Sequence, residues 1–532
     1  MKKLLFLVVF IIPQFSPAAV WQWSVEVKGP VSTETNAVAR AFLWIPEDCK
    51  QVKGVIVGQH NMSEEGILEH PDFRKGMCKL GFAEVWISPG FAMTFDFHKG
   101  AGEVFEQLMV DLAGVSGYEE LATAPIVPIG HSAYASYPWN FGAWKPERTL
   151  AIISEHGDAP LTPLTGSGRP NPNWENRNIE GVPGLMVIGE YEWWMDRVQP
   201  ALDYKERYPQ APISLLVDAG HGHFDVSDEL VAYLVKFLEK AAYYRLPKKL
   251  DKNKARVLKP INPNEGWLRE IWKKDSIPTV KAAPFDQYKG DKRKAFWYFD
   301  KDMAQYTENY YQSSRGKVEQ FLGFQKAGGL LEFNPQSHAR IVGKFEPEGD
   351  GLTFYLKPVF TNEDRTSLVK KHASGKPEII RICGPVEKVN DTTFSIRFYR
   401  MGLNNQKRTG DIWLLARHLG DCVYKSAVQQ FNMRIPYPLD KGEKQTIEFS
   451  AIPDQGQKVN SISLDARSSL GLPVYFYIQE GPAEVKNGKL VFSKIPPRSK
   501  FPIKVTVVAW QYGKLNEIQT AEPVKRSFYI NQ

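Results

Sequence analysis

Long apolar runs and a strong excess of charge are missing from most of this chain. Beyond the N-terminus, no apolar stretch reaches the roughly 18 residues that a membrane-spanning helix requires. The formal net charge is only +7 over 532 residues, and much of it lies in residues 248–259. No basic stripe is interleaved with aromatic residues, as it is in nucleic-acid-binding surfaces. The sequence therefore predicts no membrane span in the mature protein and no nucleic-acid partner.

The one continuous apolar segment stands at the N-terminus. Lys2 and Lys3 precede the apolar residues 4–12, and Ala18 and Ala19 follow as small residues suited to cleavage. This order is that of a secretory signal peptide, and the apolar core is too short to serve as an anchor. We expect residues 1–19 to be removed and the mature protein to be secreted or periplasmic.

Cysteine is also scarce. The four cysteines form two pairs along the sequence, one in each half of the chain: Cys49 with Cys78, and Cys383 with Cys422. Four cysteines allow three pairings, and we hypothesise one disulfide within each pair because an exported protein can form them. No pair has the Cys-x-x-Cys spacing of a zinc knuckle, and we expect neither a metal nor a cofactor.

The length predicts about three domains. Over residues 20–247, apolar runs alternate with helical stretches, which predicts an α/β domain with a mostly parallel sheet covered on both faces. Residues 248–300 are basic and contain prolines, so we expect a linker. Aromatic-rich alternating segments predict a β-rich domain over residues 301–436, and strands separated by turns predict an Ig-like β-sandwich over residues 437–532. In the first domain we expect strands over residues 55–58, 83–88, 125–129, 150–154, 185–188 and 213–217, and helices over residues 101–115 and 228–242.

The most informative motif follows the third of these strands. Ser132 stands in Gly-His-Ser-Ala, residues 130–133, directly after the apolar run. A tight turn of this kind lifts a serine hydroxyl above a sheet, where a histidine can deprotonate it and backbone N–H groups can stabilise an oxyanion. Gly-x-Ser also occurs in ordinary loops, so the motif gains meaning only from its partners.

Candidate partners follow two later strands. Glu190 and Glu192 come after the strand at 185–188, and His221 and His223 come after the strand at 213–217. Ligands of open α/β sheets gather at the carboxyl ends of the strands, where all these residues are expected. The chain order of serine, acid and histidine is that of the α/β-hydrolase triad.

On these motifs, residues 50–245 resemble the α/β-hydrolase superfamily, and particularly its exported esterases. The resemblance implies that Ser132 is the nucleophile and that Glu192, at the fourth position of Gly-Glu-Tyr-Glu, orients the histidine. The Ala-Gly-His-Gly segment, residues 219–222, implies His221 as the base.

Alternatives to two of these roles remain open. His223 lies two residues from His221 and can take its place as the base, although we favour His221. Glu190 or Asp196 can take the place of Glu192 as the acid.

The resemblance also implies two backbone N–H groups as oxyanion donors. One is Ala133, directly after the nucleophile, and the other is Met62 or Asn61 in the loop after the strand at 55–58. The His-Gly-Gly that is usual in this loop is missing.

The chain departs from the family pattern at Tyr134, where glycine is usual. We expect this tyrosine to point outward and Ala135 to supply the small residue instead. Further aromatic residues follow the nucleophile and the acid, and they either pack in the core or form a stacking floor for a sugar or phenolic group. The aromatic residues in question are Tyr134, Tyr137, Trp139, Trp144, Trp193 and Trp194.

The favoured function is a serine esterase that forms an acyl-enzyme on Ser132. Analogy with multidomain secreted esterases favours an ester on a plant or other polysaccharide, such as an acetyl, feruloyl or methyl-uronate group. A serine peptidase of the same fold is an alternative, although the β domains of such enzymes usually precede the hydrolase domain. A non-catalytic glycan-binding surface protein is another. Metal-dependent hydrolysis would use histidines that show no complete ligand spacing, namely His131, His156, His221 and His223.

Overall fold

The structure is a computed structural model of the whole chain. It describes residues 20–29, 37–163, 165, 167–192, 195–248, 257–399 and 408–532. The expected signal peptide and the aromatic pair Trp193 and Trp194 lie outside the described residues. None of the helices in the described ranges is long and apolar enough to cross a membrane.

A central sheet of eight strands forms the first domain, in the order β1-β2-β4-β3-β5-β6-β7-β8. Strands β3 to β8 run parallel, and β1 and β2 add an antiparallel edge. The strands are β1 (Trp23–Glu26), β2 (Arg40–Trp44), β3 (Gly54–Gln59), β4 (Phe82–Ser88), β5 (Ile126–His131), β6 (Ile152–Glu155), β7 (Gly184–Gly189) and β8 (Ile213–Asp218). The six predicted strands are therefore all present, and this order is that of the α/β-hydrolase sheet.

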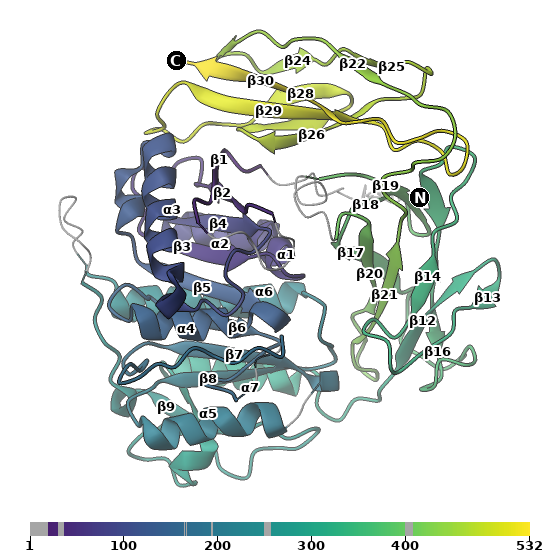
Figure 1. Cartoon of the computed structure of the whole chain (residues 1–532). Helices are drawn as coiled ribbons and strands as arrows, with labels where there is room; N and C mark the ends of the chain where they lie inside the picture. Colours follow the sequence, from purple (N-terminus) through teal and green to yellow (C-terminus); the bar gives the residue numbers. More distant parts are fainter. Residues whose placement is uncertain are drawn as a thin grey trace, which may run out of the picture.

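Helices lie on both sides of this sheet (Figure 1). They are α1 (Glu64–Leu68), α2 (Pro71–Leu80), α3 (Ala101–Ser116), α4 (Tyr137–Trp144), α5 (Met195–Arg207) and α6 (Asp228–Arg245). Strands β3 to β8 are buried along their whole length because they are covered from both sides. This explains why they read as continuous apolar runs rather than as alternating ones.

The predicted linker, residues 248–300, is in large part folded. Beyond residue 256 the chain forms β9 (Trp267–Glu270), β10 (Ala283–Pro284), β11 (Ala295–Tyr298) and α7 (Lys301–Gln312). Ser214 Oγ on β8 donates to Trp297 O at 2.5 Å, and Tyr298 OH donates to Leu215 O at 2.6 Å. Since β8 is the last strand of the sheet, the apolar residues of this segment cover it. The first domain therefore extends to about the end of α7.

The rest of the chain is all-β, as expected. Sheets β13-β12-β16, β14-β21-β20-β17 and β15-β19-β18 are followed by β22-β25, β23-β30-β29-β26 and β24-β28-β27. Their strands are β12 (Phe321–Lys326), β13 (Gly329–Leu330), β14 (Val342–Lys344), β15 (Thr353–Tyr355), β16 (Lys357–Thr361), β17 (Glu378–Cys383), β18 (Val386–Lys388), β19 (Thr393–Ile396), β20 (Asp411–His418), β21 (Ala427–Arg434), β22 (Ile447–Phe449), β23 (Gln455–Gly456), β24 (Ser461–Ser463), β25 (Ala466–Ser468), β26 (Tyr475–Glu480), β27 (Ala483–Lys486), β28 (Lys489–Phe492), β29 (Ile503–Trp510) and β30 (Val524–Asn531).

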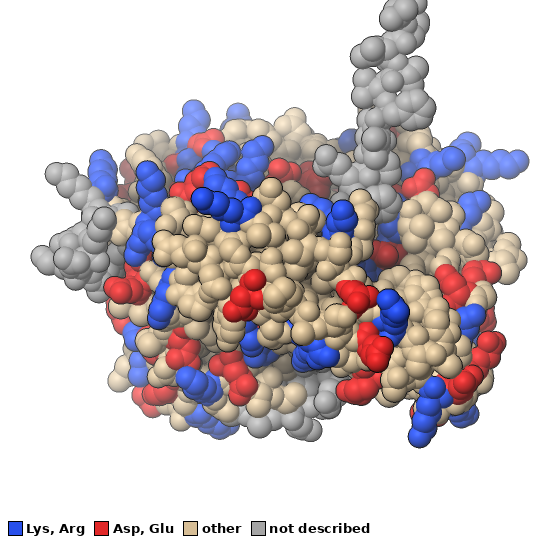
Figure 2. All heavy atoms as spheres, turned by 90° about the horizontal axis from the view of Figure 1, so that it is seen from above, with Lys and Arg blue, Asp and Glu red and all other residues tan. Residues whose placement is uncertain are grey.

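The two all-β regions pack on the first domain and on each other. In Figure 1 the last sheets lie across the end of the α/β domain that carries β1, and β17, β20 and β21 lie beside it. Trp21 forms a β-bridge with Gly481, and Arg498 pairs with Glu120 at 2.9 Å. Basic and acidic side chains are interspersed over the face seen from above (Figure 2). Specific contacts therefore hold the all-β regions against the first domain.

Neither hypothesised disulfide is present. All four cysteines are free thiols; Cys49 and Cys383 are buried, whereas Cys78 and Cys422 are exposed. Each hypothesised pair therefore combines one buried and one exposed residue. The Sγ of Cys383 instead lies 3.9 Å from the Sδ of Met62 in the first domain.

A test of the extended first domain follows from Tyr311 on α7. Its hydroxyl accepts the Val217 N–H of β8 at 3.0 Å and donates to Leu215 O at 3.3 Å. Tyr311→Phe leaves that buried N–H without a partner, so we expect a loss of about 1–3 kcal/mol in stability. Denaturant unfolding measures it. The matched control is Tyr243→Phe, since Tyr243 is 77% exposed; equal stability of the two variants would show that α7 does not support β8.

Candidate active site

The chain makes a strained turn at Ser132. Strand β5 ends at His131, and Ser132 opens the short helix η3 (Ser132–Tyr134) with φ of 53°. This left-handed conformation is uncommon outside glycine and is a feature of functional turns. A Cβ at Gly130 would lie 2.2 Å from the carbonyl oxygen of Tyr134, so only glycine fits there. The turn therefore has the geometry of a nucleophile elbow and presents the Ser132 hydroxyl above the sheet.

Tyr134 does not point outward, contrary to our expectation. Its side chain is buried, and its hydroxyl donates to Gly90 O at 3.1 Å. The close approach at this turn is made by Ala135 instead, because a Cβ on Gly157 would lie 1.8 Å from the Ala135 Cβ. The small residue is thus needed one position later than in the family pattern.

The structure brings His223, rather than His221, to the Ser132 hydroxyl. The Ser132 hydroxyl lies 2.7 Å from His223 Nε2, and His223 Nδ1 is hydrogen-bonded to Glu192 Oε2. Glu192 belongs to the short helix η4 (Glu190–Glu192) directly after β7, and its Oε1 accepts the Gly189 N–H at 2.9 Å. Serine, histidine and glutamate therefore form one hydrogen-bonded chain.

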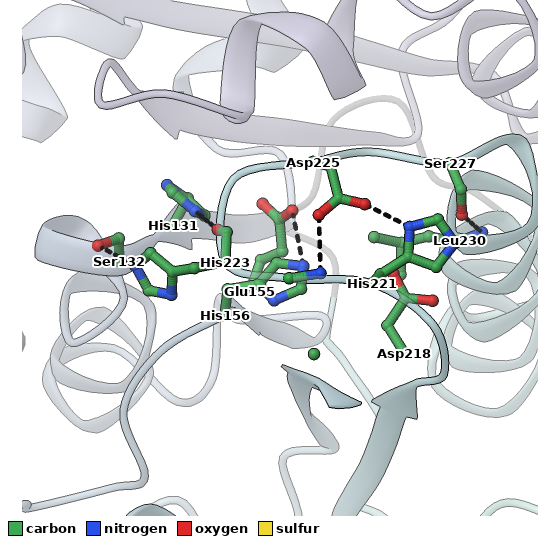
Figure 3. A network of polar contacts seen from close by, with 12 residues as sticks. His131, Ser132, Glu155, His156, Asp218, His221, His223, Asp225, Ser227 and Leu230 are labelled. Atoms are coloured by element: carbon green, nitrogen blue, oxygen red, sulfur yellow. Dashed lines mark hydrogen bonds and ion pairs between the residues drawn. The ribbon is translucent and has the colours of Figure 1, made fainter. Parts of the chain in front are cut away.

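His221 occupies a different place, which corrects the preference for it as the base. Its Nδ1 is hydrogen-bonded to Asp225 Oδ2, and Asp225 Oδ1 accepts the Gly222 N–H at 3.0 Å. In Figure 3, Ser132 and His223 lie at one end of the polar network and His221 with Asp218 at the other. The ring of His221 thus shapes the loop that carries His223.

Asp218, His221 and Asp225 place their ligand atoms within 4.8 Å of one another, a spacing that can also suit a metal ion. Burial lowers the pKa of His221, but Asp218 and Asp225 outweigh it and raise this pKa to about 9. The hydroxyl of Tyr310 donates to Asp218 Oδ1. The ring of His221 is therefore held beside two carboxyl groups, with Asp225 as its hydrogen-bond partner.

Neither alternative acid reaches His223. Glu190 Oε2 accepts the Gly220 N–H at 2.8 Å, and Glu190 Oε1 accepts from Lys425 Nζ at 2.9 Å. Asp196 is exposed in the first turn of α5. Glu190 therefore supports the start of the histidine loop instead of orienting the histidine ring.

The loop after β3 does not offer a free Met62 N–H, as the oxyanion assignment required. The N–H groups of Asn61 and Met62 donate to Glu64 Oε2 at 3.1 and 3.0 Å, and the His131 N–H donates to Glu64 Oε1 at 2.8 Å. The Ala133 N–H makes no hydrogen bond to any residue in the part of the chain that the structure describes. Of the two sequence-predicted donors, only Ala133 is therefore available.

His131 links the nucleophile turn to the histidine loop. Its Nε2–H donates to His223 O at 2.6 Å, and its Nδ1 accepts from Asn61 Nδ2 at 3.2 Å. Burial, with the nearby imidazoles, holds the pKa of His131 well below its ordinary value, which fits a neutral ring with one donor and one acceptor. His131, between Gly130 and Ser132, therefore fixes the backbone of His223.

The aromatic residues after the nucleophile are core residues. The hydroxyl of Tyr137 donates to Val57 O at 3.2 Å and the indole of Trp139 to Asp158 O at 2.7 Å, and both side chains are buried. They do not form the stacking floor considered above. The aromatic group beside His223 is built instead from Phe224 and Trp413, whose ring centroids are 5.0 Å apart.

Comparison with known proteins adds the following. No family model matches the chain, and no curated protein matches it in sequence. It is similar to the solved structures of esterase PE8 (15% identity over 37% of this chain and 97% of that one, TM-score 0.29) and of Est1E from Butyrivibrio proteoclasticus (16%, 41% and 99%, TM-score 0.28). It is also similar to an S-formylglutathione hydrolase from Agrobacterium tumefaciens (14%, 41% and 94%, TM-score 0.30). The fold is defined by the strand order of the sheet and by the turn at Ser132.

The geometry predicts opposite behaviour of the two histidines. We expect His223→Ala to slow the reaction of Ser132 with a fluorophosphonate by about 10³-fold or more, because the hydroxyl loses its base. His221→Asn keeps a donor toward Asp225 and leaves the contact between Ser132 and His223 in place, so we expect a much smaller loss. The rate of adduct formation on Ser132, followed by mass spectrometry, measures both. A larger loss in His221→Asn would restore His221 as the base.

Proposed function

We propose that this protein is a secreted serine hydrolase that cleaves carboxylic esters. Ser132 is the nucleophile and His223 is the general base. Glu192 orients His223 and stabilises its protonated form. The observation that carries the proposal is the hydrogen-bonded chain from the Ser132 hydroxyl through His223 to Glu192, built on a strained elbow.

The proposed reaction has two halves. Ser132 Oγ attacks the ester carbonyl while its proton passes to His223 Nε2, and the resulting imidazolium is stabilised by Glu192. Collapse of the tetrahedral intermediate breaks the bond to the alkoxy group, which leaves with the proton from His223. A water molecule then attacks the acyl-enzyme by the same route and regenerates the Ser132 hydroxyl.

Charge on the tetrahedral oxygen needs donors that are already in place. The Ala133 N–H, at the start of η3, is one such donor, and each donor of this kind is worth about 3 kcal/mol to the transition state. The Asn61 and Met62 N–H groups are held by Glu64. The loop after β3 therefore supplies no second donor while Glu64 holds these two groups.

The all-β region adjoining the site belongs to the proposed enzyme. Lys425 holds Glu190, Trp413 packs on Phe224, and Arg408 Nη1 donates to Asn61 O at 2.9 Å. These contacts reach the histidine loop and the loop after β3 from one side. Since they support the two loops that surround Ser132, they favour an enzyme over a glycan-binding protein with a decayed hydrolase domain.

We propose an ester on a polysaccharide as the substrate, with an acetyl, feruloyl or methyl-uronate group. Its support is the signal-peptide pattern of residues 1–19, which implies an extracellular or periplasmic substrate, together with the attached all-β regions. Both observations concern where the enzyme works and how it is built. Assays on a panel of esters therefore identify which ester is the substrate.

The test is hydrolysis of p-nitrophenyl acetate and of a panel of acetylated, feruloylated and methyl-esterified glycans. Ser132→Ala should lower kcat by about 10⁴-fold or more. Ser136→Ala is the matched control, because the buried Ser136 hydroxyl has no hydrogen-bond partner among the described residues. Full turnover by Ser132→Ala would refute the mechanism. Faster cleavage of aminoacyl anilides than of all esters would instead indicate a peptidase.

A further inference from the structure

A cluster of metal-ligand side chains lies on the loop that carries His223, at the far end of the polar network from Ser132 (Figure 3). It consists of Asp218, which ends β8, together with His221 and Asp225. One nitrogen of His221 and one carboxylate oxygen of each aspartate lie within 4.8 Å of one another, and all three residues are buried. The proposed reaction uses none of these three side chains.

Each aspartate of the cluster is anchored through one carboxylate oxygen. Asp218 Oδ1 accepts from the Tyr310 hydroxyl, and Asp225 Oδ1 accepts the Gly222 N–H at 3.0 Å. The other oxygen of Asp225, Oδ2, faces His221 Nδ1. Metal ligands are commonly oriented in this way by a surrounding layer of hydrogen-bonding groups. The second oxygen of each carboxyl group is not needed for anchoring.

The second oxygen of Asp218 is the observation that points to a ligand. Asp218 is 0% exposed, and its Oδ2 has no hydrogen-bond partner among the described residues. In Figure 3 its carboxyl group lies directly below the ring of His221. A buried carboxylate oxygen without a partner is costly, and a cation at this place would satisfy it.

The charges around the cluster also favour a cation. In the part of the chain that the structure describes, no lysine or arginine forms an ion pair with Asp218 or Asp225, and Asp225 pairs with His221 alone. Burial raises the pKa of Asp218, and Asp225 adds to the rise although His221 opposes it. Two carboxyl groups this close repel each other when both are ionised. A divalent ion between them removes that repulsion.

A cavity connects the cluster to the outside of the molecule. It has a volume of about 390 Å³ and lies between α6, α7 and the segment that precedes β21. His221 lines this cavity, together with Glu229 on α6 and Lys317. A metal ion and its water ligands therefore have an entry path to the cluster.

We propose that Asp218, His221 and Asp225 bind one Zn²⁺ ion. The sequence led us to expect no metal, because the histidines by themselves form no ligand set. One imidazole and two carboxylates supply nitrogen and oxygen donors together, which suits Zn²⁺, whereas Ca²⁺ takes oxygen ligands. Three protein ligands leave a fourth position for a water molecule from the cavity. The ion takes the place of the proton between His221 Nδ1 and Asp225 Oδ2, which is released to solvent.

The bound ion clamps the loop that carries His223. It joins Asp218, at the end of β8, to His221 and Asp225, so that ligands lie on both sides of His223 in the sequence. Because the cluster and Ser132 lie at opposite ends of the polar network, the ion does not contact the ester (Figure 3). The clamping role rests on the proposed function of His223, whereas the zinc site itself does not.

The test is a titration of the chelator-treated, tag-free full chain with Zn²⁺, in competition with a chromophoric chelator. We expect one tight site per chain. Asp218→Asn should weaken this site by about 100-fold or more, because the variant loses a ligand oxygen while its remaining carbonyl oxygen can still accept from Tyr310. Equal affinity of the two proteins, or no tight site in the wild-type chain, would overturn the proposal.

The matched control is Glu229→Gln. Glu229 lines the same cavity but does not belong to the cluster, so the removal of its charge should change zinc affinity by no more than about twofold. A loss as large as that in Asp218→Asn would show that zinc binds to the cavity wall and would overturn the proposal. Absence of any fluorophosphonate adduct on Ser132 would refute the proposed function and leave the zinc titration unaffected.

Hydrogen exchange of the wild-type chain covers the case in which Asp218→Asn does not fold. A clamp suppresses local opening, so Zn²⁺ should slow the exchange of the amides of residues 218–225 by about tenfold or more. Mass spectrometry of peptides from this segment, compared with and without Zn²⁺, measures the effect. Slower exchange only in other segments, or unchanged exchange throughout the chain, would overturn the proposal.

Discussion

One buried carboxylate, that of Glu64, holds the nucleophile turn and the neighbouring loop in place. It accepts three backbone N–H groups, two from the loop after β3 and one from His131 at the end of β5. Burial raises the pKa of Glu64 to about 7, and these N–H donors oppose the rise. A buried carboxylate is costly without such donors. If the two loops moved apart, the Glu64 carboxylate would lose some of its N–H donors while still buried. The left-handed turn at Ser132 depends on this fixed frame.

Further buried carboxylates fix the remaining parts of the site in the same way. Glu190 holds Gly220, Asp225 holds Gly222, and Glu192 holds His223. Each of these carboxyl groups also contacts a basic side chain: Glu190 contacts Lys425, Asp225 contacts His221, and Glu192 contacts His156. Buried ion pairs contribute little net stability, but removing one partner is strongly destabilising. These contacts therefore fix the positions of the loops around Ser132. One of the contacting residues, Lys425, comes from the all-β region more than 200 residues after Ser132.

The parts of the fold that were predictable are those encoded in local patterns. Buried parallel strands read as continuous apolar runs, so β3 to β8 were found within two residues of their ends. The segment after residue 256 was not predicted, because its basic and proline-rich composition resembles a linker, whereas its role is to cover β8, the last strand of the sheet. Tyr134 was misplaced for a similar reason: whether a tyrosine points inward depends on a carbonyl, that of Gly90, brought close by the fold.

The order of residues in the sequence identifies only part of the site. The order of serine, acid and histidine located Ser132 and Glu192, but His221 and His223 occupy one loop and both follow β8. What separates them is Asp225, which takes the ring of His221 and leaves His223 to face the elbow. A carboxylate four residues after a histidine is a weak signal on its own. Glu155 ends β6 and His156 follows it, at the edge of the sheet where Ser132, Glu192 and His223 meet, and the sequence suggested His156 only as a metal ligand. Only the structure shows that His156 contacts one carboxylate oxygen of Glu192 while His223 contacts the other.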